Sequence, residues 1–107
     1  MISAPDIVLY DTTLRDGMQR EGMSVSVDEK VRIALRIADL GIHVIEGGFA
    51  GSNPKDDEFF HRMERESTGT TVLAAFGMTR GRGVDAEDDD SLRALVSCWA
   101  PVAAVVG

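Results

Sequence analysis

The chain has 107 residues, of which 44% are hydrophobic and 27% charged, and its formal net charge is −7. That length allows at most one domain of ordinary globular composition. The acidic balance argues against nucleic acid and anionic membranes as partners, because both require a basic patch. No apolar run approaches the roughly 20 residues that span a bilayer, and no signal peptide pattern opens the chain. The single cysteine, Cys98, fits a reducing cytoplasm, where we expect the protein to lie.

Four buried strands are predicted along the chain, and each is a continuous apolar run. They cover residues 7–10, 42–46, 71–76 and 102–106. Continuous rather than alternating apolar runs are typical of a parallel sheet that is covered by helices. Polar, glycine-rich segments follow the first three strands, at the end where α/β sheets and barrels place their sites.

Three helices are predicted between these strands. Ser26 and Glu29 form a capping box at the start of the first helix, and Gly41 ends it. Asn53 caps the second helix, with Pro54 at its first position, and the third covers residues 91–99. The expected buried side of the first helix is Val31, Ala34, Leu35 and Ala38, widened by Ile33, Ile37 and Leu40; that of the second is Phe59, Phe60 and Met63.

The densest polar cluster, residues 11–22, follows the first strand directly. Asp16 in this cluster and Glu46 on the second strand are expected at neighbouring strand ends, and parallel strands lie about 5 Å apart. A carboxylate there suits a hard divalent cation, and Arg15 suits the carboxylate of a 2-oxo acid or a developing enolate oxygen. The alternative is a structural ion pair that ties the loop to the sheet.

The remaining polar residues carry weaker signals. His43 is expected at the opposite end of the sheet, His61 on the outside of the second helix, and Cys98 in a core-facing helix without a neighbouring base. The acidic run 85–90 is interpreted as a solvated loop before the third helix. The glycine- and arginine-rich segment 77–83 is either a phosphate-binding loop or a plain loop, and it matches no known phosphate-loop spacing.

The segment Asp-Thr-Thr-Leu-Arg-Asp-Gly-Met-Gln at residues 11–19 resembles the first-strand motif of the acyl-CoA-condensing barrel enzymes. These are the isopropylmalate, homocitrate and citramalate synthases, with hydroxymethylglutaryl-CoA lyase as a relative. Arg20-Glu21-Gly22, which follows, is similar to long-form citramalate synthases rather than to isopropylmalate synthases. Three further segments share that likeness, at residues 45–48, 51–60 and 74–80.

This resemblance implies the N-terminal portion of a TIM (β/α)8 barrel, about three and a half βα units, with residues 1–107 as part of a single truncated catalytic domain. It implies Asp16 as a metal ligand (Mg, Mn or Zn), Arg15 on the carbonyl or enolate oxygen, Gln19 lining the site and Glu46 as a polar support. The implied reaction condenses acetyl-CoA with pyruvate to give citramalate, for isoleucine synthesis, in an enzyme that dimerises when full length.

Several departures from the family pattern accompany this likeness. Met18 stands where threonine or glutamate is usual, and Phe49 and Ala50 stand where tryptophan and proline are common. The family carries its His-x-His metal ligands and a catalytic glutamate on later strands, so the 107-residue chain alone is expected to be inactive. Two alternatives stay open: an isopropylmalate or homocitrate synthase with another 2-oxo acid, and a non-catalytic truncated product.

Overall fold

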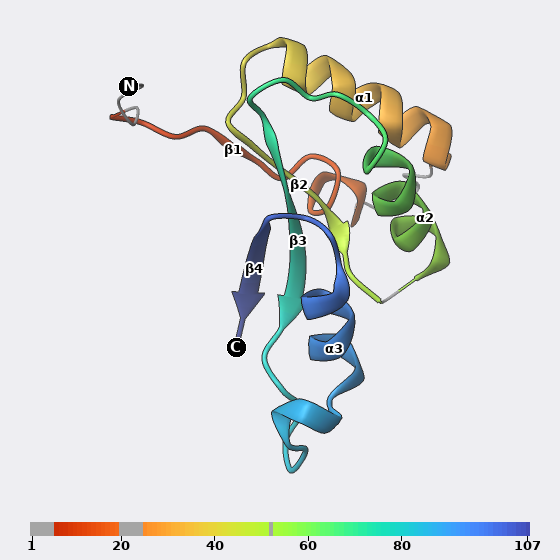
Figure 1. The fold of residues 1–107 in the computed structure, drawn as a ribbon, viewed down its shortest axis with the longest axis vertical. Helices are drawn as coiled ribbons and strands as arrows, with labels where there is room; N and C mark the ends of the chain where they lie inside the picture. The colour runs from red at the N-terminus through yellow and green to blue at the C-terminus, as the bar shows by residue number, and fades with distance from the viewer. Residues whose placement is uncertain (1–5, 20–24, 52) are drawn as a thin grey trace.

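The structure is a computed structural model that describes residues 6–19, 25–51 and 53–107. Its strands form one sheet in the order β1-β2-β3-β4, with every pair parallel, as predicted (Figure 1). The strands are β1 (Tyr10–Asp11), β2 (Val44–Phe49), β3 (Val72–Met78) and β4 (Val102–Val106). The helices are α1 (Val27–Asp39), α2 (Pro54–Met63) and α3 (Asp90–Ser97), with short 3-10 turns η1 (Gly17–Gln19) and η2 (Ala86–Asp88).

The predicted helix caps are confirmed. The Ser26 hydroxyl accepts from the Glu29 amide at 3.1 Å while the Glu29 carboxylate accepts from the Ser26 amide at 3.2 Å, which completes the capping box of α1. The Asn53 side chain accepts from the third residue of α2 at 2.8 Å. Gly41 follows α1 at φ 84°, a left-handed conformation that favours glycine.

The prediction of a buried first strand over residues 7–10 is wrong. β1 is only two residues long and pairs with β2 through Tyr10 and Asp11 alone. Ile7, Val8 and Leu9 are 73%, 56% and 50% exposed. The physical reason is that the segment before Tyr10 extends away from the sheet and its helices, so its side chains have little to pack against (Figure 1).

Two other predicted boundaries are corrected by the glycines. β2 starts at Val44 and runs on through Gly47 and Gly48 to Phe49, so Glu46 lies inside the strand and not at its end. β3 likewise continues through Gly77 to Met78. A Cβ on Gly47 would lie 2.6 Å from the Phe59 ring, so this glycine allows α2 to approach the strand closely. Glycine in these strands therefore serves helix packing rather than a turn.

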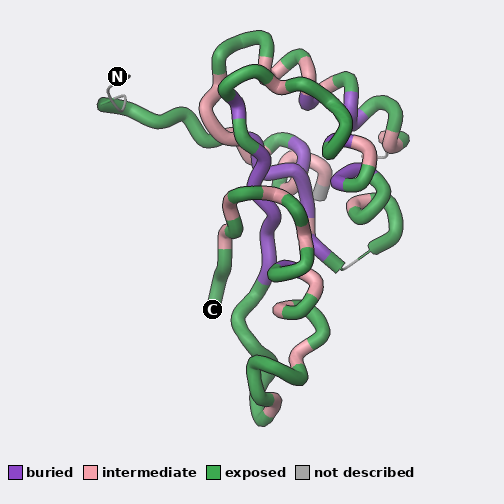
Figure 2. Tube along the Cα trace, viewed as in Figure 1, coloured by how far each residue is buried: buried purple, intermediate pink, exposed green. Residues whose placement is uncertain are grey.

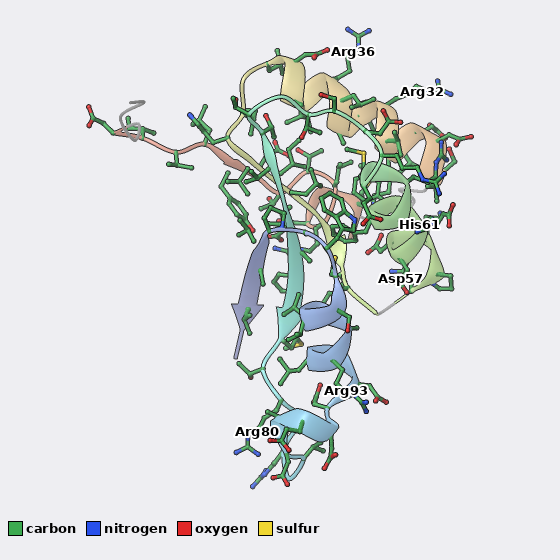
Figure 3. The ribbon with its side chains drawn as sticks, in the orientation of Figure 1. Arg32, Arg36, Asp57, His61, Arg80 and Arg93 are labelled. Atoms are coloured by element: carbon green, nitrogen blue, oxygen red, sulfur yellow. The ribbon has the colours of Figure 1, made fainter. Side chains whose placement is uncertain are left out.

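The helix boundaries need smaller corrections. α3 begins at Asp90 rather than residue 91 and ends at Ser97 rather than residue 99, with the Asp89 carboxylate accepting from the Leu92 amide at 2.9 Å as its cap. Leu40, predicted to widen the buried side of α1, is 80% exposed because it follows the last helical residue. Arg32 and Arg36 point away from the sheet, as expected for the polar side of α1 (Figure 3).

The two faces of the sheet differ in their cover. The helices pack on one face, which we call the outer face, and on it Ile45, Leu73 and Ala75 are almost completely buried. Figure 2 shows that the buried part of the chain follows the central strands. By strand alternation and register, Tyr10, Glu46 and Phe76 share the opposite, inner face. A (β/α) barrel has eight parallel strands with all its helices on the outside, so four parallel strands with their helices on one face correspond to half of such a barrel. No described helix is long and apolar enough to cross a membrane.

Candidate active site

The loop after β1 is a tight turn built on one carbonyl group. The Thr12 carbonyl oxygen accepts from the amides of Arg15, Asp16 and Gly17 at 3.2, 2.8 and 3.2 Å. Leu14, which is 1% exposed, anchors the turn in the core. Because both sides of Leu14 are fixed in this way, the turn places Arg15 and Asp16 at the carboxyl end of the sheet, as predicted.

Asp11 belongs to the structure of this turn. One of its carboxylate oxygens accepts from the Thr13 amide at 2.9 Å and the other from the Thr13 hydroxyl at 3.1 Å. Such an Asx-type contact uses both oxygens locally. Of Asp11 and Asp16, the two carboxylates that the structure describes here, Asp16 is therefore the one available for a ligand.

Arg15 crosses from this loop to the inner face of the sheet. Its Nε donates to Glu46 Oε1, and its guanidinium lies over the Phe76 ring, with Cζ 4.1 Å from the ring centroid. The Phe49 ring packs edge-on against Phe76 at a centroid distance of 4.9 Å. A planar guanidinium suits a carboxylate on one edge and an aromatic ring on one face. The structure thus joins Arg15 and Glu46, which lie 31 positions apart in the sequence.

Glu46 is enclosed and fully engaged. Its side chain is 3% exposed; Oε1 accepts from Arg15 and Oε2 from the Tyr10 hydroxyl. Burial of the Tyr10 hydroxyl and its contact with this carboxylate raise the pKa of Tyr10 above its ordinary range. With both oxygens occupied, Glu46 is suited to hold its neighbours rather than to bind a metal or take a proton.

Tyr10 is a residue that the sequence prediction missed, because it was counted as one more apolar residue of a buried strand. The structure places its hydroxyl on Glu46, across the β1–β2 pair. The available signal was a tyrosine at the end of an apolar run, since a tyrosine hydroxyl near the core requires a polar partner.

Asp16 lies beside Arg15 but more open to solvent. Its side chain is 66% exposed, and its Oδ1 is 3.8 Å from Arg15 Nη1, too far for a hydrogen bond. Gln19 ends the turn η1, one turn after Asp16. The motif Arg20-Glu21-Gly22 lies outside the residues that the structure describes.

The donor set for a metal is incomplete in the described part of the chain. Asp16 offers an exposed carboxylate of the kind a hard divalent cation binds, but such a cation takes about six ligands. Within residues 6–19, 25–51 and 53–107, no group of three or more His, Cys, Asp or Glu side chains could hold a metal ion. These residues therefore fit one ligand position and not a complete metal centre.

Comparison with known proteins identifies the family, since the HMGL-like profile matches residues 6–88. The chain belongs to the HMGL-like family. It is 45% identical over 101 residues to the (R)-citramalate synthase of Geobacter sulfurreducens, covering 94% of this chain and 19% of that protein. It is 41% identical over 104 residues to the (R)-citramalate synthase of Aquifex aeolicus, covering 97% of this chain and 20% of that protein.

A second kind of HMGL-like relative is also similar. The 2-isopropylmalate synthase of Pyrococcus furiosus is 46% identical over 71 residues, which cover 66% of this chain and 14% of that protein. The chain spans about a fifth of the length of the citramalate synthases it matches. With the family established, the four-stranded sheet is the N-terminal part of an HMGL-like TIM barrel. Enzymes of this family are typically metal-dependent and condense acyl-CoA substrates.

Lys30 and Asp56 form a second ion pair in this HMGL-like chain that the sequence prediction missed. Lys30 is 3% exposed, and its Nζ donates to Asp56 Oδ1 at 2.7 Å and to the Gly47 carbonyl at 3.0 Å, above the Phe59 ring. Asp56 Oδ2 accepts from the Phe49 amide at 3.0 Å. The signal was the position of Lys30 on the buried side of α1, one turn before a core alanine.

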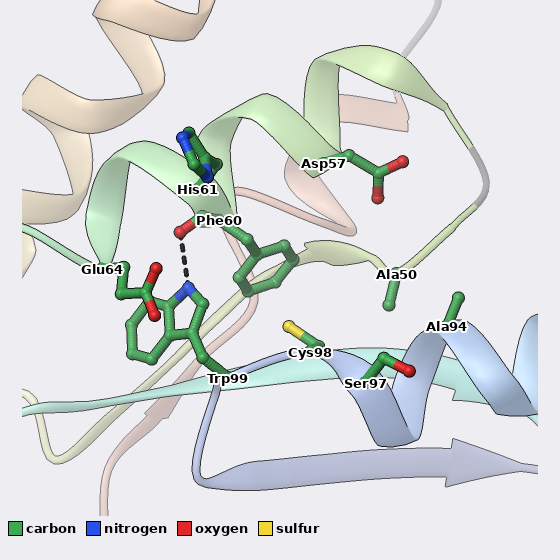
Figure 4. Close-up of a pocket in the computed structure, with 9 residues that line it drawn as sticks. All are labelled: Ala50, Asp57, Phe60, His61, Glu64, Ala94, Ser97, Cys98 and Trp99. Atoms are coloured by element: carbon green, nitrogen blue, oxygen red, sulfur yellow. Dashed lines mark hydrogen bonds between the residues drawn. The ribbon is translucent and has the colours of Figure 1, made fainter.

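A pocket of about 290 Å³ lies on the outer side of the sheet, between α2 and α3 (Figure 4). Its wall includes His61 and Cys98, and Trp99 Nε1 donates to the Phe60 carbonyl at 2.6 Å beside it. Because none of its lining residues belongs to the Arg15 group, this pocket is separate from the candidate active site.

The segment 77–83 is engaged with its own chain. The Gly81 amide donates to the Asp89 carboxylate at 2.7 Å, and Arg80 donates to the Val84 carbonyl at 2.8 Å. The hydrogen bonds from the Gly81 and Leu92 amides hold the pKa of Asp89 below its ordinary value. Because the Gly81 amide and an Arg80 terminal nitrogen already have acceptors within the loop, the structure favours the plain-loop interpretation.

Proposed function

We propose that the complete protein is an acyltransferase that condenses acetyl-CoA with pyruvate to give citramalate, and that residues 1–107 are the N-terminal part of its single TIM-barrel catalytic domain. The observation that carries this proposal is the Arg15 guanidinium, held by Glu46 and Phe76 beside the exposed Asp16. The 45% identity to a citramalate synthase supports pyruvate as the 2-oxo acid.

In the proposed reaction, the enolate carbon of acetyl-CoA attacks the keto carbon of pyruvate, and thioester hydrolysis then releases the thiol. Arg15 stabilises the negative charge that develops on oxygen, because its terminal nitrogens keep donors that no described residue uses. Glu46 fixes the guanidinium in place. Gln19, the last residue of η1, is proposed to line the site.

Asp16 is proposed as one ligand of a divalent metal, Mg, Mn or Zn. When bound, such an ion supplies Lewis acidity toward the keto group. Its other ligands, like the base that takes a proton from the acetyl methyl group, are proposed to come from parts of the enzyme beyond the described residues, because these hold no complete donor group. The full-length enzyme is proposed to be a cytoplasmic homodimer.

A chimera tests the assignment. Residues 6–107 replace the matching segment of the Geobacter sulfurreducens citramalate synthase, to which the chain is 45% identical over 101 residues. We expect thiol release from acetyl-CoA with pyruvate, in the presence of a divalent metal, at a rate within about tenfold of the parent enzyme. The 107-residue chain alone is expected to show none.

Two further measurements make the test specific. Asp16→Asn in the chimera should abolish metal-dependent turnover, whereas the matched change Asp39→Asn, at the exposed end of α1, should not. A chimera that folds but prefers a longer 2-oxo acid would favour the isopropylmalate synthase alternative, which the Pyrococcus furiosus relative supports. A folded chimera without any turnover, or turnover by the isolated chain, would overturn the proposal.

A further inference from the structure

The hydrogen bonds of Glu46 point to a role for a residue outside the proposed catalytic set. Its carboxylate contacts Arg15 through one oxygen only, Oε1, and through one nitrogen only, Nε. A carboxylate beside an arginine commonly binds in a two-pronged way, with each oxygen accepting from a different nitrogen. The contact between Glu46 and Arg15 is instead one-pronged, with a single oxygen and a single nitrogen.

Tyr10 occupies the second oxygen of the Glu46 carboxylate. Its hydroxyl donates to Oε2, the oxygen that would otherwise turn toward an Arg15 Nη group. Glu46 is 3% exposed, and the Tyr10 hydroxyl is the one partner of Oε2 among the described residues. An unpartnered buried carboxylate oxygen is costly, so without Tyr10 the carboxylate would rotate to accept from two arginine nitrogens.

The availability of the Arg15 donors follows from this arrangement. A guanidinium has five N–H donors, and Glu46 takes the single one on Nε. Phe76 covers a face of the group and takes no N–H donor. Among the described residues, none accepts from Nη1 or Nη2, since Asp16 is 3.8 Å from Nη1.

We propose that Tyr10 is a positioning residue that keeps Glu46 one-pronged on Arg15, so that both Nη groups of Arg15 stay available to a substrate oxygen. The hydrogen-bond part of this inference concerns the chain alone. Only the statement that a substrate oxygen uses the Nη groups rests on the proposed function.

Hydrogen exchange of the arginine side chain tests the inference by NMR on the 107-residue protein. In the parent, we expect a protected Arg15 Nε–H and rapidly exchanging Nη groups; Arg15→Lys identifies the signals. In Tyr10→Phe, one Nη group should exchange about tenfold more slowly, because it gains a charge-assisted hydrogen bond. The matched hydroxyl deletion Ser97→Ala, on the exposed side of α3, should leave the Arg15 signals unchanged.

A second measurement does not require Tyr10→Phe to fold. Tyr10 is the only tyrosine in the sequence, so growth on 3-fluorotyrosine labels this one site. Glu46→Gln should shift the fluorine resonance, and the exposed change Glu87→Gln should not. An Arg15 Nη group that is already protected in the parent, unchanged Nη exchange in a folded Tyr10→Phe variant, or an unmoved fluorine signal in Glu46→Gln would each overturn the inference.

These readouts measure hydrogen bonds and not turnover. A failed chimera assay with the expected exchange pattern would overturn the condensing function and leave the role of Tyr10 standing. An active chimera without the exchange pattern would overturn the role of Tyr10 and leave the condensing function standing.

Discussion

Two ion pairs contact β2, one on each face of the sheet. On the outer face, Lys30 and Asp56 satisfy each other and two backbone groups of the strand. On the inner face, Arg15 gives one of its donors to Glu46, and its terminal nitrogens have no hydrogen-bond acceptor among the described residues, with Asp16 as an ion-pair partner at 3.8 Å. Both pairs are largely withdrawn from water, so burial alone does not distinguish them.

The difference lies in how many hydrogen-bonding groups each pair leaves unused. The outer pair is closed, because the Asp56 carboxylate accepts two hydrogen bonds and the Lys30 ammonium donates two and also lies over the Phe59 ring. The inner pair is open, because the Arg15 Nη groups, which lie toward Asp16, donate to no described residue. A closed pair can stabilise the fold but cannot bind a ligand, whereas an open pair can do both. Unused donors are thus a better guide to the functional face than burial or charge.

Breaking the closed pair should have the largest effect on stability. Lys30→Met leaves Asp56 beside the core without its cation, and this should lower the free energy of unfolding by about 3–5 kcal/mol. Urea denaturation measures the loss. The matched change Lys55→Met removes an exposed lysine whose acceptor among the described residues is the Val25 carbonyl, and it should cost far less. Equal losses in the two variants would contradict the closed-pair description.

Altering the open pair should instead affect activity. In the chimera, Arg15→Lys keeps the positive charge but removes the planar fork, and kcat/KM should fall about 100-fold. The urea midpoint should move less than in Lys30→Met. The exposed Arg65→Lys serves as the control for the same chemical change. If Arg15→Lys destabilises the fold and leaves kcat/KM intact, the Arg15–Glu46 pair stabilises the fold and does not serve catalysis, which contradicts the proposal.

The tight packing of the outer face offers a third comparison. A methyl group on Gly47 would lie 2.6 Å from the Phe59 ring and 3.2 Å from Leu73. Gly47→Ala should therefore cost about 1–3 kcal/mol of stability, measured by thermal or urea unfolding. Gly81→Ala, where the nearest atom is an Asp89 oxygen at 3.5 Å, should be nearly neutral. A neutral Gly47→Ala would show that α2 is not closely packed on β2.

The smallest expected effect concerns acid stability at exposed carboxylates. The Ser26 amide and hydroxyl hold the pKa of Glu29 below its ordinary value, and Arg62 does the same for Asp28. A lowered folded-state pKa adds stability above the unfolded value, and this stability is lost as the pH falls through the folded value. The urea midpoint should therefore decline below about pH 4.

Charge-neutral variants separate this effect from general acid unfolding. Glu29→Gln should lose part of the acid-dependent decline between pH 7 and pH 3, while Glu87→Gln in η2 should retain all of it. Identical pH profiles for the two variants would rule out the capping box as a source of acid sensitivity.

Local signals in the sequence were sufficient for the order of the elements and for the helix caps, but not for the extent of the first strand. Ser26, Asn53 and Gly41 act on neighbouring residues, so their effects follow from spacing along the chain. The same holds for the turn that presents Arg15 and Asp16, which is built on the single carbonyl of Thr12.

Pairings between distant residues could not be predicted in this way. The sequence does not show that Tyr10 lies at a sheet edge with its hydroxyl on Glu46, because these residues are 36 positions apart and their contact depends on the register of β1 against β2. Similarly, the glycines after Glu46 fit either a loop or a strand, and only the Phe59 ring packed against Gly47 decides between them.

By itself, the sequence determined the α/β class, the order of its elements and the motif that carries Arg15 and Asp16, since each depends on local periodicity or on adjacent residues. Only the tertiary structure decided which ion pair is closed, with its hydrogen-bonding groups used, and which is open, with donors left for a ligand. Lys30 and Arg15 are both cations in the sequence, but they contact opposite faces of β2. Lys30 is enclosed between helix and strand, whereas Arg15 keeps terminal N–H groups that no described residue accepts.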